Sequence, residues 1–336
     1  MKPRHWVIFA AGLTISALSL FLVLRQKDWA EFSRLLVTAR HEFILLRIGI
    51  LLAALAAQGL RWSILAERRL STPDGFWLFG IGMLFNNILP ARLGEGVRLA
   101  LASRREQMDA FSAGTSIVAE RLTDVLALAA LSLVFFTHPA VPQQFTTAGI
   151  LTGAVGLAGV TFVLVFGSIS PQKLLAVTGR LCEALRLKDG LRHRILEAVE
   201  RVVLSIPSAG RFLLALAWAL VIWALGAGAA WVLMLAFWPA APPWIMGVVT
   251  VVAAGLGIAV PSGPAGVGTF EAAVAGSLIF FGYEPDISIT FALIMHLTVI
   301  ATTSSVGVVG LLREGVRLNA LLAESSTVQH AQQAKD

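Results

Sequence analysis

Two polar interruptions within otherwise apolar segments constrain the fold of this chain more than any other feature. The first covers residues 85–98 and reads FNNILPARLGEGVR, and the second covers residues 260–271 and reads VPSGPAGVGTFE. Each contains proline, continues through glycine and leads to a glutamate that opens a new helical pattern. Broken backbone at membrane depth is tolerated only inside protein or beside a wet cavity, because lipid cannot satisfy its N–H and C=O groups. We therefore predict that the two interruptions face each other and form the working site.

The composition places the apolar segments in a membrane. Of the 336 residues, 57% are hydrophobic and 14% are charged, whereas soluble domains carry about 25% charged residues. We predict an all-α polytopic membrane protein, with a single membrane domain over residues 1–336 and about six full spans. The predicted spans are Trp6–Leu24, Phe43–Leu65, Ala110–Phe136, Thr146–Phe166, Phe212–Phe237 and Ile287–Leu312.

The two interruptions lie within residues 76–109 and 245–282, whose apolar arms are too short to cross a bilayer comfortably. We predict that these segments form broken re-entrant hairpins or pairs of short helices. The order span, amphipathic helix, span, hairpin, span describes residues 6–136, and the same order describes residues 146–312 in reversed orientation. Inverted repeats with discontinuous helices at their interface are typical of transporters, so we predict that architecture here.

The basic residues predict the orientation in the membrane. They gather at both ends of the chain and in residues 170–211, which predicts cytoplasmic termini and a cytoplasmic amphipathic segment over 170–211. Residues 28–40 are predicted to form an interfacial amphipathic helix. Arg47 and Arg61 lie near opposite ends of a predicted span and are expected to snorkel toward the interfaces. This orientation leaves one conflict, because it places four basic residues outside: Arg25, Lys27, Arg34 and Arg40.

The arginines and asparagines around the first interruption are candidate donors to a substrate. Helix N-termini attract anions, and the second arm of each hairpin begins at such an N-terminus. Arg92, Arg98 and Arg121 would add bidentate donors for a phosphate group. Asn86 and Asn87 are candidate hydrogen-bond donors to a lipid head group, or they satisfy the broken backbone itself.

The acidic residues and one histidine leave two interpretations open. Glu95 and Glu271 either cap the second arms and pair with arginine, or one of them titrates and couples proton movement to substrate movement. Glu120 lies beside Arg121 in the first half of a predicted span and completes the predicted substrate-binding set. His296 in the last span is either a satisfied interior histidine or part of a proton relay.

Signatures of enzymes are missing from the sequence. There is no HExxH, Walker A, CxxC or GxSxG motif, so we predict no catalytic residues, no metal and no cofactor. The net charge of +6 comes from residues clustered at the ends of apolar runs, which does not predict nucleic-acid binding. The only cysteine is Cys182, so the chain cannot form an internal disulfide.

Three segments together resemble a known family. They are NNILPARLGEGVR at 86–98, AERLTDVLALA at 119–129 and VPSGPAGVGTFEAA at 260–273. In these the chain resembles the lysylphosphatidylglycerol synthase transmembrane region family, also called the flippase-like domain family. The resemblance implies a multi-pass protein of the bacterial inner membrane that moves lipids or lipid-linked molecules between leaflets, or helps to move them. It does not imply aminoacyl-lipid synthesis, because we expect no soluble aminoacyl transferase domain here. His296 stands where many relatives are expected to have arginine.

Three functions remain open at this stage. The first is a lipid transporter of the flippase type, acting on a phospholipid or a lipid-linked substrate. The second is an integral-membrane transferase acting on a polyprenyl- or hopanoid-linked substrate, which a requirement for a divalent metal would favour. The third is a non-catalytic scaffold that binds a lipid-biosynthetic enzyme through residues 170–211, which a stoichiometric partner would favour.

Overall fold

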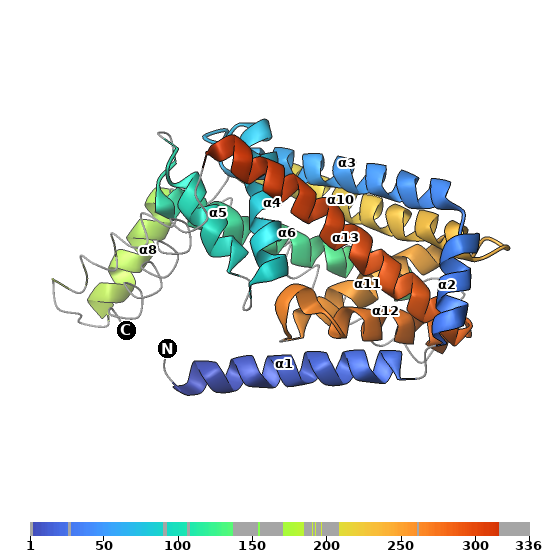
Figure 1. The fold of residues 1–336 in the computed structure, drawn as a ribbon. Helices are drawn as coiled ribbons and strands as arrows, with labels where there is room; N and C mark the ends of the chain where they lie inside the picture. Colours follow the sequence, from blue (N-terminus) through green and yellow to red (C-terminus); the bar gives the residue numbers. More distant parts are fainter. Residues whose placement is uncertain are drawn as a thin grey trace.

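The computed structural model describes residues 3–25, 28–89, 93–105, 108–136, 171–184, 208–260 and 262–315, together with four single residues between 154 and 196. Every element within these ranges is helical, which confirms the predicted all-α class (Figure 1). The helices are α1 (Pro3–Leu24), α2 (Trp29–Thr38), α3 (His41–Leu65), α4 (Thr72–Ile88), α5 (Gly94–Ala102), α6 (Ala110–Phe136), α8 (Pro171–Ala184), α10 (Ala209–Phe237), α11 (Ile245–Ala259), η3 (Pro264–Gly266), α12 (Thr269–Phe280) and α13 (Pro285–Glu314).

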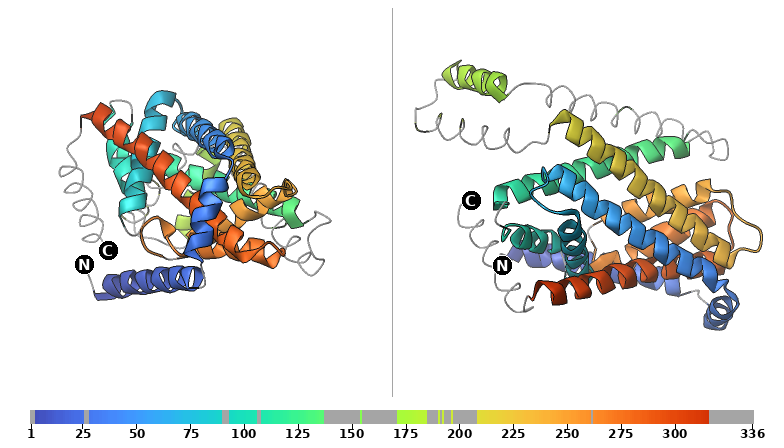
Figure 2. Two further views of the ribbon diagram at one scale, coloured as in Figure 1. Left: turned by 45° about the vertical axis from the view of Figure 1, so that its right-hand side comes forward. Right: turned by 90° about the horizontal axis from the view of Figure 1, so that it is seen from above.

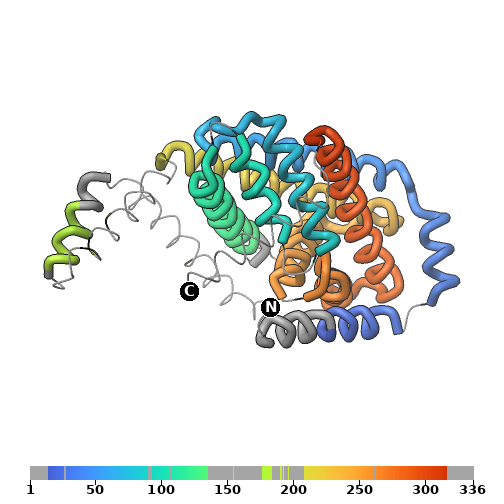
Figure 3. The backbone as a smooth tube through the Cα atoms, turned by 60° about the vertical axis from the view of Figure 1, so that its left-hand side comes forward, coloured from blue at the N-terminus to red at the C-terminus, as the bar shows by residue number. Residues whose placement is uncertain are grey.

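Three of these helices, α3, α10 and α13, are long and apolar enough to cross a membrane. The helices α1 and α6 coincide with two further predicted spans. The predicted span at 146–166 lies outside the described residues, apart from the single residue 154, so the number of spans stays a prediction. Within residues 170–211, the structure describes α8, which lies beside the main bundle rather than inside it (Figure 3).

The centre of the bundle is built on close contacts between long helices. The helices α3 and α10 lie side by side, and α13 packs along α4 (Figure 2). At the second contact, a side chain on Gly307 would come within 2.5 Å of the Gly80 carbonyl oxygen. Small residues let helix backbones approach in this way. The paired glycines therefore set the spacing between α4 and α13.

The first interrupted segment forms a hairpin of α4 and α5 that begins and ends at the same end of the bundle. Arg105, which follows α5, contacts Asp74 in the first turn of α4 at 3.2 Å. The two arms are about 25 Å and about 14 Å long, and the second is far too short to span a bilayer. Helix α4 begins at Thr72, earlier than position 76, because Ser71 caps it by accepting the Asp74 N–H.

The second interrupted segment forms a matching hairpin of α11 and α12. Trp238, before α11, has its ring 5.5 Å from the ring of Tyr283, which follows α12, and the two rings meet edge to face. Both arms therefore start and finish at one end of the bundle, opposite the end where α4 and α5 start and finish (Figures 1 and 2). Each segment is thus a hairpin that returns to the end of the bundle from which it starts, and whether it is re-entrant in the membrane stays a prediction. Whether the two halves of the chain form an inverted repeat stays a prediction.

The described connections that were predicted to be cytoplasmic lie together at one end of the structure. At one end, Arg211 pairs with Glu67 at 2.5 Å, and Arg105 pairs with Glu314 at 2.7 Å. Asp109 caps α6 at the same end, where the hydroxyl and then the N–H of Ser112 hold the pKa of its carboxyl below the usual value. Which end faces the cytoplasm stays a prediction.

At the other end, contacts explain why basic residues are tolerated there. Arg34 pairs with Glu31 within α2, with its Nη2 2.5 Å from the carboxylate. Arg40 donates from its guanidinium to the carbonyls of Leu235 and Trp238 at the C-terminus of α10. A helix C-terminus carries partial negative charge and free carbonyls. Both charges are therefore offset within the protein, which reduces the predicted conflict in orientation.

Candidate functional site

The tip of the second hairpin lies against the first hairpin. The short helix η3, which belongs to the second interruption, packs against α4 of the first hairpin. The tip of the first hairpin includes residues 90–92, which lie outside the described residues, as does the candidate Arg92. The described parts of the two interruptions are thus neighbours, as the sequence analysis expected of a shared site.

The two asparagines before the first tip are used inside the protein. The Oδ1 of Asn86 accepts the N–H of Gly94 at 2.9 Å, at the point where α5 begins. The amide of Asn87 donates to the hydroxyls of Thr303 and Ser304 on α13, each at 3.0 Å. These contacts match the interpretation that the asparagines satisfy the broken backbone and join it to α13, and the interpretation as head-group donors stays a prediction.

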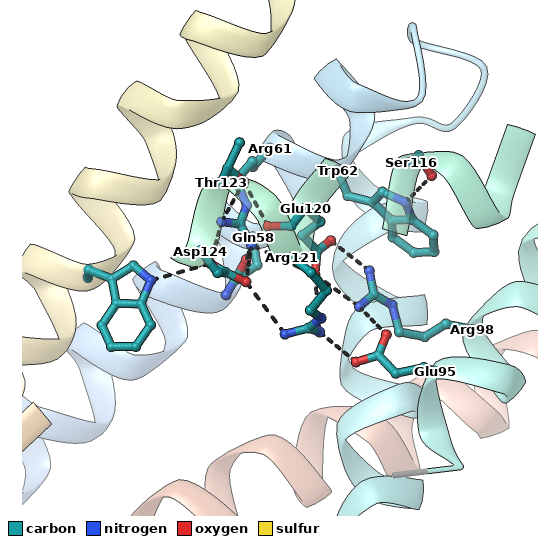
Figure 4. A network of polar contacts seen from close by, with 11 residues as sticks. Gln58, Arg61, Trp62, Glu95, Arg98, Ser116, Glu120, Arg121, Thr123 and Asp124 are labelled. Carbon is teal, nitrogen blue, oxygen red and sulfur yellow. Dashed lines mark hydrogen bonds and ion pairs between the residues drawn. The ribbon is translucent and has the colours of Figure 1, made fainter. Parts of the chain in front are cut away.

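A buried arginine–glutamate pair forms the centre of a polar network on the first hairpin and α6 (Figure 4). The Nη1 and Nη2 atoms of Arg98 lie 3.1 and 2.8 Å from the two carboxylate oxygens of Glu120. Both residues are almost fully buried, and the guanidinium of Arg98 stacks over the rings of Trp62 and Phe79 at 4.2 and 4.7 Å. Both terminal nitrogens of Arg98 are therefore used inside the protein, while its buried Nε has no hydrogen-bond partner, and its predicted role in phosphate binding stays a prediction.

A second ion pair lies at the accessible edge of the same network. Arg121 contacts Glu95 at 2.5 Å, and their side chains are 48% and 29% exposed. Glu95 also accepts from Arg98 at 3.3 Å, so it joins the exposed arginine to the buried one. Of the predicted arginine donors that the structure describes, Arg121 is the one that a ligand reaches without unpacking the core.

The network continues into α3 through Arg61 and into α10 through Trp223. The sequence predicted a different position for Arg61. Arg61 is fully buried and contacts Asp124 at 2.6 Å and the Oε1 of Gln58 at 2.6 Å. The Nε1 of Trp223 on α10 donates to Asp124 at 3.3 Å. The prediction that Arg61 snorkels is wrong, because this carboxylate partner holds it inside. The spacing of Gln58 with Arg61 was the available signal, since residues three apart share a helix face.

The charges within this network balance. Three arginines face three carboxylates, and none of the six lacks an ion-pair partner. They are Arg61, Arg98, Arg121, Glu95, Glu120 and Asp124. An added anion would therefore have to replace one of the carboxylates. The exposed pair of Arg121 and Glu95 is the place where such an exchange needs the least rearrangement.

The second tip is organised by Glu271 and His296. The Oε2 of Glu271 accepts the N–H of Gly268 at 2.7 Å, and its Oε1 lies 2.7 Å from the Nδ1 of His296. The Nε2 of His296 lies 3.2 Å from the carbonyl oxygen of Ala265, and Phe270 stacks on the imidazole at 4.1 Å. Glu271 therefore caps α12, as one interpretation expected, but its side-chain partner is histidine and not arginine.

The tip requires glycine at one position for two reasons. Gly268 has φ of +91°, and a side chain there would collide with the backbone carbonyl of Ser16 on α1. The hydroxyl of Ser16 in turn accepts the N–H of Gly263 at 2.7 Å. Helix α1 thus packs directly against the second tip and satisfies part of its broken backbone.

Arg47 is a further buried cation, outside the predicted set. It lies on α3 and is 1% exposed, so the prediction that it snorkels is also wrong. Its guanidinium donates to the hydroxyl of Thr298 at 2.8 Å and to the carbonyl of Met295 at 3.0 Å. Its Nη1 has no hydrogen-bond partner, and no carboxylate in the described ranges contacts it. Arg47 therefore brings an unbalanced positive charge to the middle of α13.

The fold and the site together define a class of protein. It is a polytopic helical membrane protein in which two helical hairpins meet beside buried, paired charges. In the described part of the chain, no three side chains of His, Cys, Asp or Glu are grouped so that they could hold one metal ion.

The chain belongs to a family with a function related to membrane lipids. The family model described as Lysylphosphatidylglycerol synthase TM region matches residues 9–307, which confirms the predicted family. No curated protein and no solved structure matches the chain closely enough to carry an argument.

Proposed function

We propose that this protein moves a phosphate-bearing lipid, or a lipid-linked molecule, between the leaflets of the bacterial inner membrane. The observation that carries the proposal is the half-exposed pair of Arg121 and Glu95 at the edge of a buried ionic network beside the hairpin tips. Membership of a membrane lipid family supports it. The proposed orientation has both termini in the cytoplasm, with the hairpins entering from opposite leaflets.

The proposed binding step is an exchange of anions on Arg121. A lipid phosphate would displace Glu95 and accept hydrogen bonds from the planar guanidinium, which suits phosphate geometry. The displaced carboxylate would keep a partner, because Glu95 also lies 3.3 Å from Arg98. Because the network is balanced before the exchange, the phosphate would add negative charge at its half-exposed edge, where water screens charge better than in the low-dielectric interior. The acyl chains would stay in the lipid.

We propose that this movement involves no covalent step. The residues at the tips bind, exchange and release a head group, and the described site needs no bond to form or break. The energy for directional movement would come from a coupled ion or from the lipid gradient itself.

A translocation assay in proteoliposomes tests the proposal. Vesicles that contain a fluorescent phospholipid and the purified protein should move lipid between leaflets faster than empty vesicles. Arg121→Glu should lower that rate about tenfold or more, which corresponds to losing a charge-assisted hydrogen bond, while Arg121→Lys should keep part of it. Arg69→Glu, which changes an exposed arginine whose side chain donates to the hydroxyl of Ser112, is the matched control. Wild-type rates in Arg121→Glu would refute the assignment.

A further inference from the structure

The hydrogen bonds of His296 fix one of its protons. The Nε2 atom lies 3.2 Å from the carbonyl oxygen of Ala265. A carbonyl oxygen only accepts hydrogen bonds, so Nε2 carries the hydrogen in this contact. The imidazole is therefore either the neutral form protonated at Nε2 or the doubly protonated cation.

The hydrogen bonds of Glu271 fix where the next proton lies. Its Oε2 accepts the N–H of Gly268 at 2.7 Å, and its Oε1 lies 2.7 Å from the Nδ1 of His296. Two acceptors do not approach to that distance without a hydrogen between them. One proton therefore sits between Nδ1 and Oε1, either on the histidine beside a carboxylate or on a carboxylic acid beside a neutral imidazole. In both forms, the pair carries no net charge.

From these contacts we infer that Glu271 and His296 form a one-proton site that locks the second hairpin tip to α13. Loss of this proton to water would leave a carboxylate beside a neutral imidazole with a single hydrogen, and the pair would carry a net negative charge. That hydrogen can serve the Oε1 of Glu271 or the carbonyl of Ala265 but not both, so the tip would lose one of its two bonds to His296. Because η3 packs on α4, release of this tip would change the junction between the hairpins. The link from the proton to lipid movement rests on the proposed function.

The backbone of the tip is consistent with a locked segment. Ala265 has φ of +58°, in the left-handed region that residues with a side chain seldom adopt. Such a conformation persists only where surrounding contacts impose it. The carbonyl of this same residue is the one that His296 holds. Loss of the hydrogen bond would therefore let Ala265 relax to a more favourable conformation.

A buried cation contacts α13 close to His296 in the sequence. Arg47 reaches the same turn of α13 from α3 through Met295 and Thr298. Among the described residues of the helices packed on α12 and α13, no other charged side chain pairs with Glu271 or His296. Within that part of the chain, Glu271 and His296 therefore have only each other as charged partners.

Hydrogen–deuterium exchange of the purified, membrane-reconstituted protein across a pH series tests the site. The readout is the protection of residues 262–271, corrected for the chemical exchange rate at each pH. In the wild type, protection of this tip should fall about tenfold or more on the alkaline side, the effect of losing a buried charge-assisted hydrogen bond. A segment in the middle of α3 serves as the internal reference and should not change.

Glu271→Gln is the informative variant. Its amide can donate to Nδ1 and accept from the Gly268 N–H, so it keeps both bonds without a titrating proton. Its tip should stay protected over the whole pH range, whereas His296→Ala should expose the tip at every pH. The same loss of protection with pH in Glu271→Gln and the wild type, or no loss in the wild type, would overturn the inference.

Lipid translocation measured over the same pH series separates this inference from the proposed function. A rate that depends on pH in the wild type and not in Glu271→Gln would support the link between proton and lipid. A pH-independent wild-type rate would refute that link. If the wild type moves no lipid at any pH, the proposed function is wrong, and the exchange data still decide whether the proton site exists.

Discussion

Glu120 is the residue on which the ionic network depends most. It takes both terminal nitrogens of Arg98, and its carboxylate also lies 3.7 Å from Arg61 and 3.4 Å from Arg121. Its side chain has no exposed surface. Burial of charge is costly unless every ion is paired, so Glu120 balances Arg98 and, together with Asp124, balances the buried Arg61.

Glu120→Gln should therefore destabilise the protein by about 3–5 kcal/mol, the usual cost of leaving buried charges without their partner. Thermal unfolding of the purified protein in detergent measures the effect. Glu95→Gln is the matched control at the exposed edge of the network and should cost about 1 kcal/mol or less. Equal unfolding temperatures for the two variants would contradict a buried ionic centre at Glu120.

At the scale of elements, the contact between α4 and α13 holds the first hairpin in place. Gly80 and Gly307 let the two backbones touch, and Asn87 adds two hydrogen bonds from α4 to α13 near the tip. A close backbone contact followed by a polar one fixes both the distance and the register of the helices. This contact therefore fixes the geometry of the ionic network that the first hairpin forms with α6.

Gly307→Ala should disturb this contact. The added carbon would lie 2.5 Å from the carbonyl oxygen of Gly80, and overpacking of this kind costs about 1–3 kcal/mol. Gly49→Ala on α3, where a side chain meets nothing within 4 Å, is the control and should be neutral or slightly stabilising. The expected result is a lower unfolding temperature for Gly307→Ala alone. An unchanged temperature would show that α4 and α13 are not in close contact.

The elements were predictable from the sequence wherever the signal is local. Proline and glycine marked both hairpin tips, and helical periodicity with charges on one side marked α2. The start of α4 was placed too late, because the apolar pattern begins after the Ser71 cap. Apolar segments show that a helix exists, whereas a cap is a single polar side chain whose role depends on the backbone around it.

The partners of the site residues were less predictable, because they come from distant parts of the chain. Arg121 meets Glu95, and His296 meets Glu271, only after the hairpins fold against the next helix. Arg61 looked like a residue near a span end that would reach water, since nothing in its own helix shows that α6 supplies a carboxylate. In each case the residue type showed that the side chain needs a polar partner. The identity of that partner could be read only from the tertiary fold.

At the scale of the whole molecule, the chain is organised around two ends and a shared middle. The hairpin of α4 and α5 enters from the end where Arg105 meets Glu314, and the hairpin of α11 and α12 enters from the end where Trp238 meets Tyr283. The two hairpins meet where η3 packs against α4. A head group that passed from one end to the other would meet both tips in turn, one with an exchangeable ion pair and one with a proton-dependent lock.

Photocrosslinking of a phospholipid with a photoreactive head group to the protein in native membranes tests this arrangement most directly. Peptide mapping of the labelled protein should place the crosslinks at the two tips and beside them, around Glu95, Arg121 and residues 262–268. Arg121→Glu should remove most of this labelling. Crosslinks confined to lipid-facing surfaces such as α2, with the same pattern in Arg121→Glu, would contradict a head-group site between the hairpins.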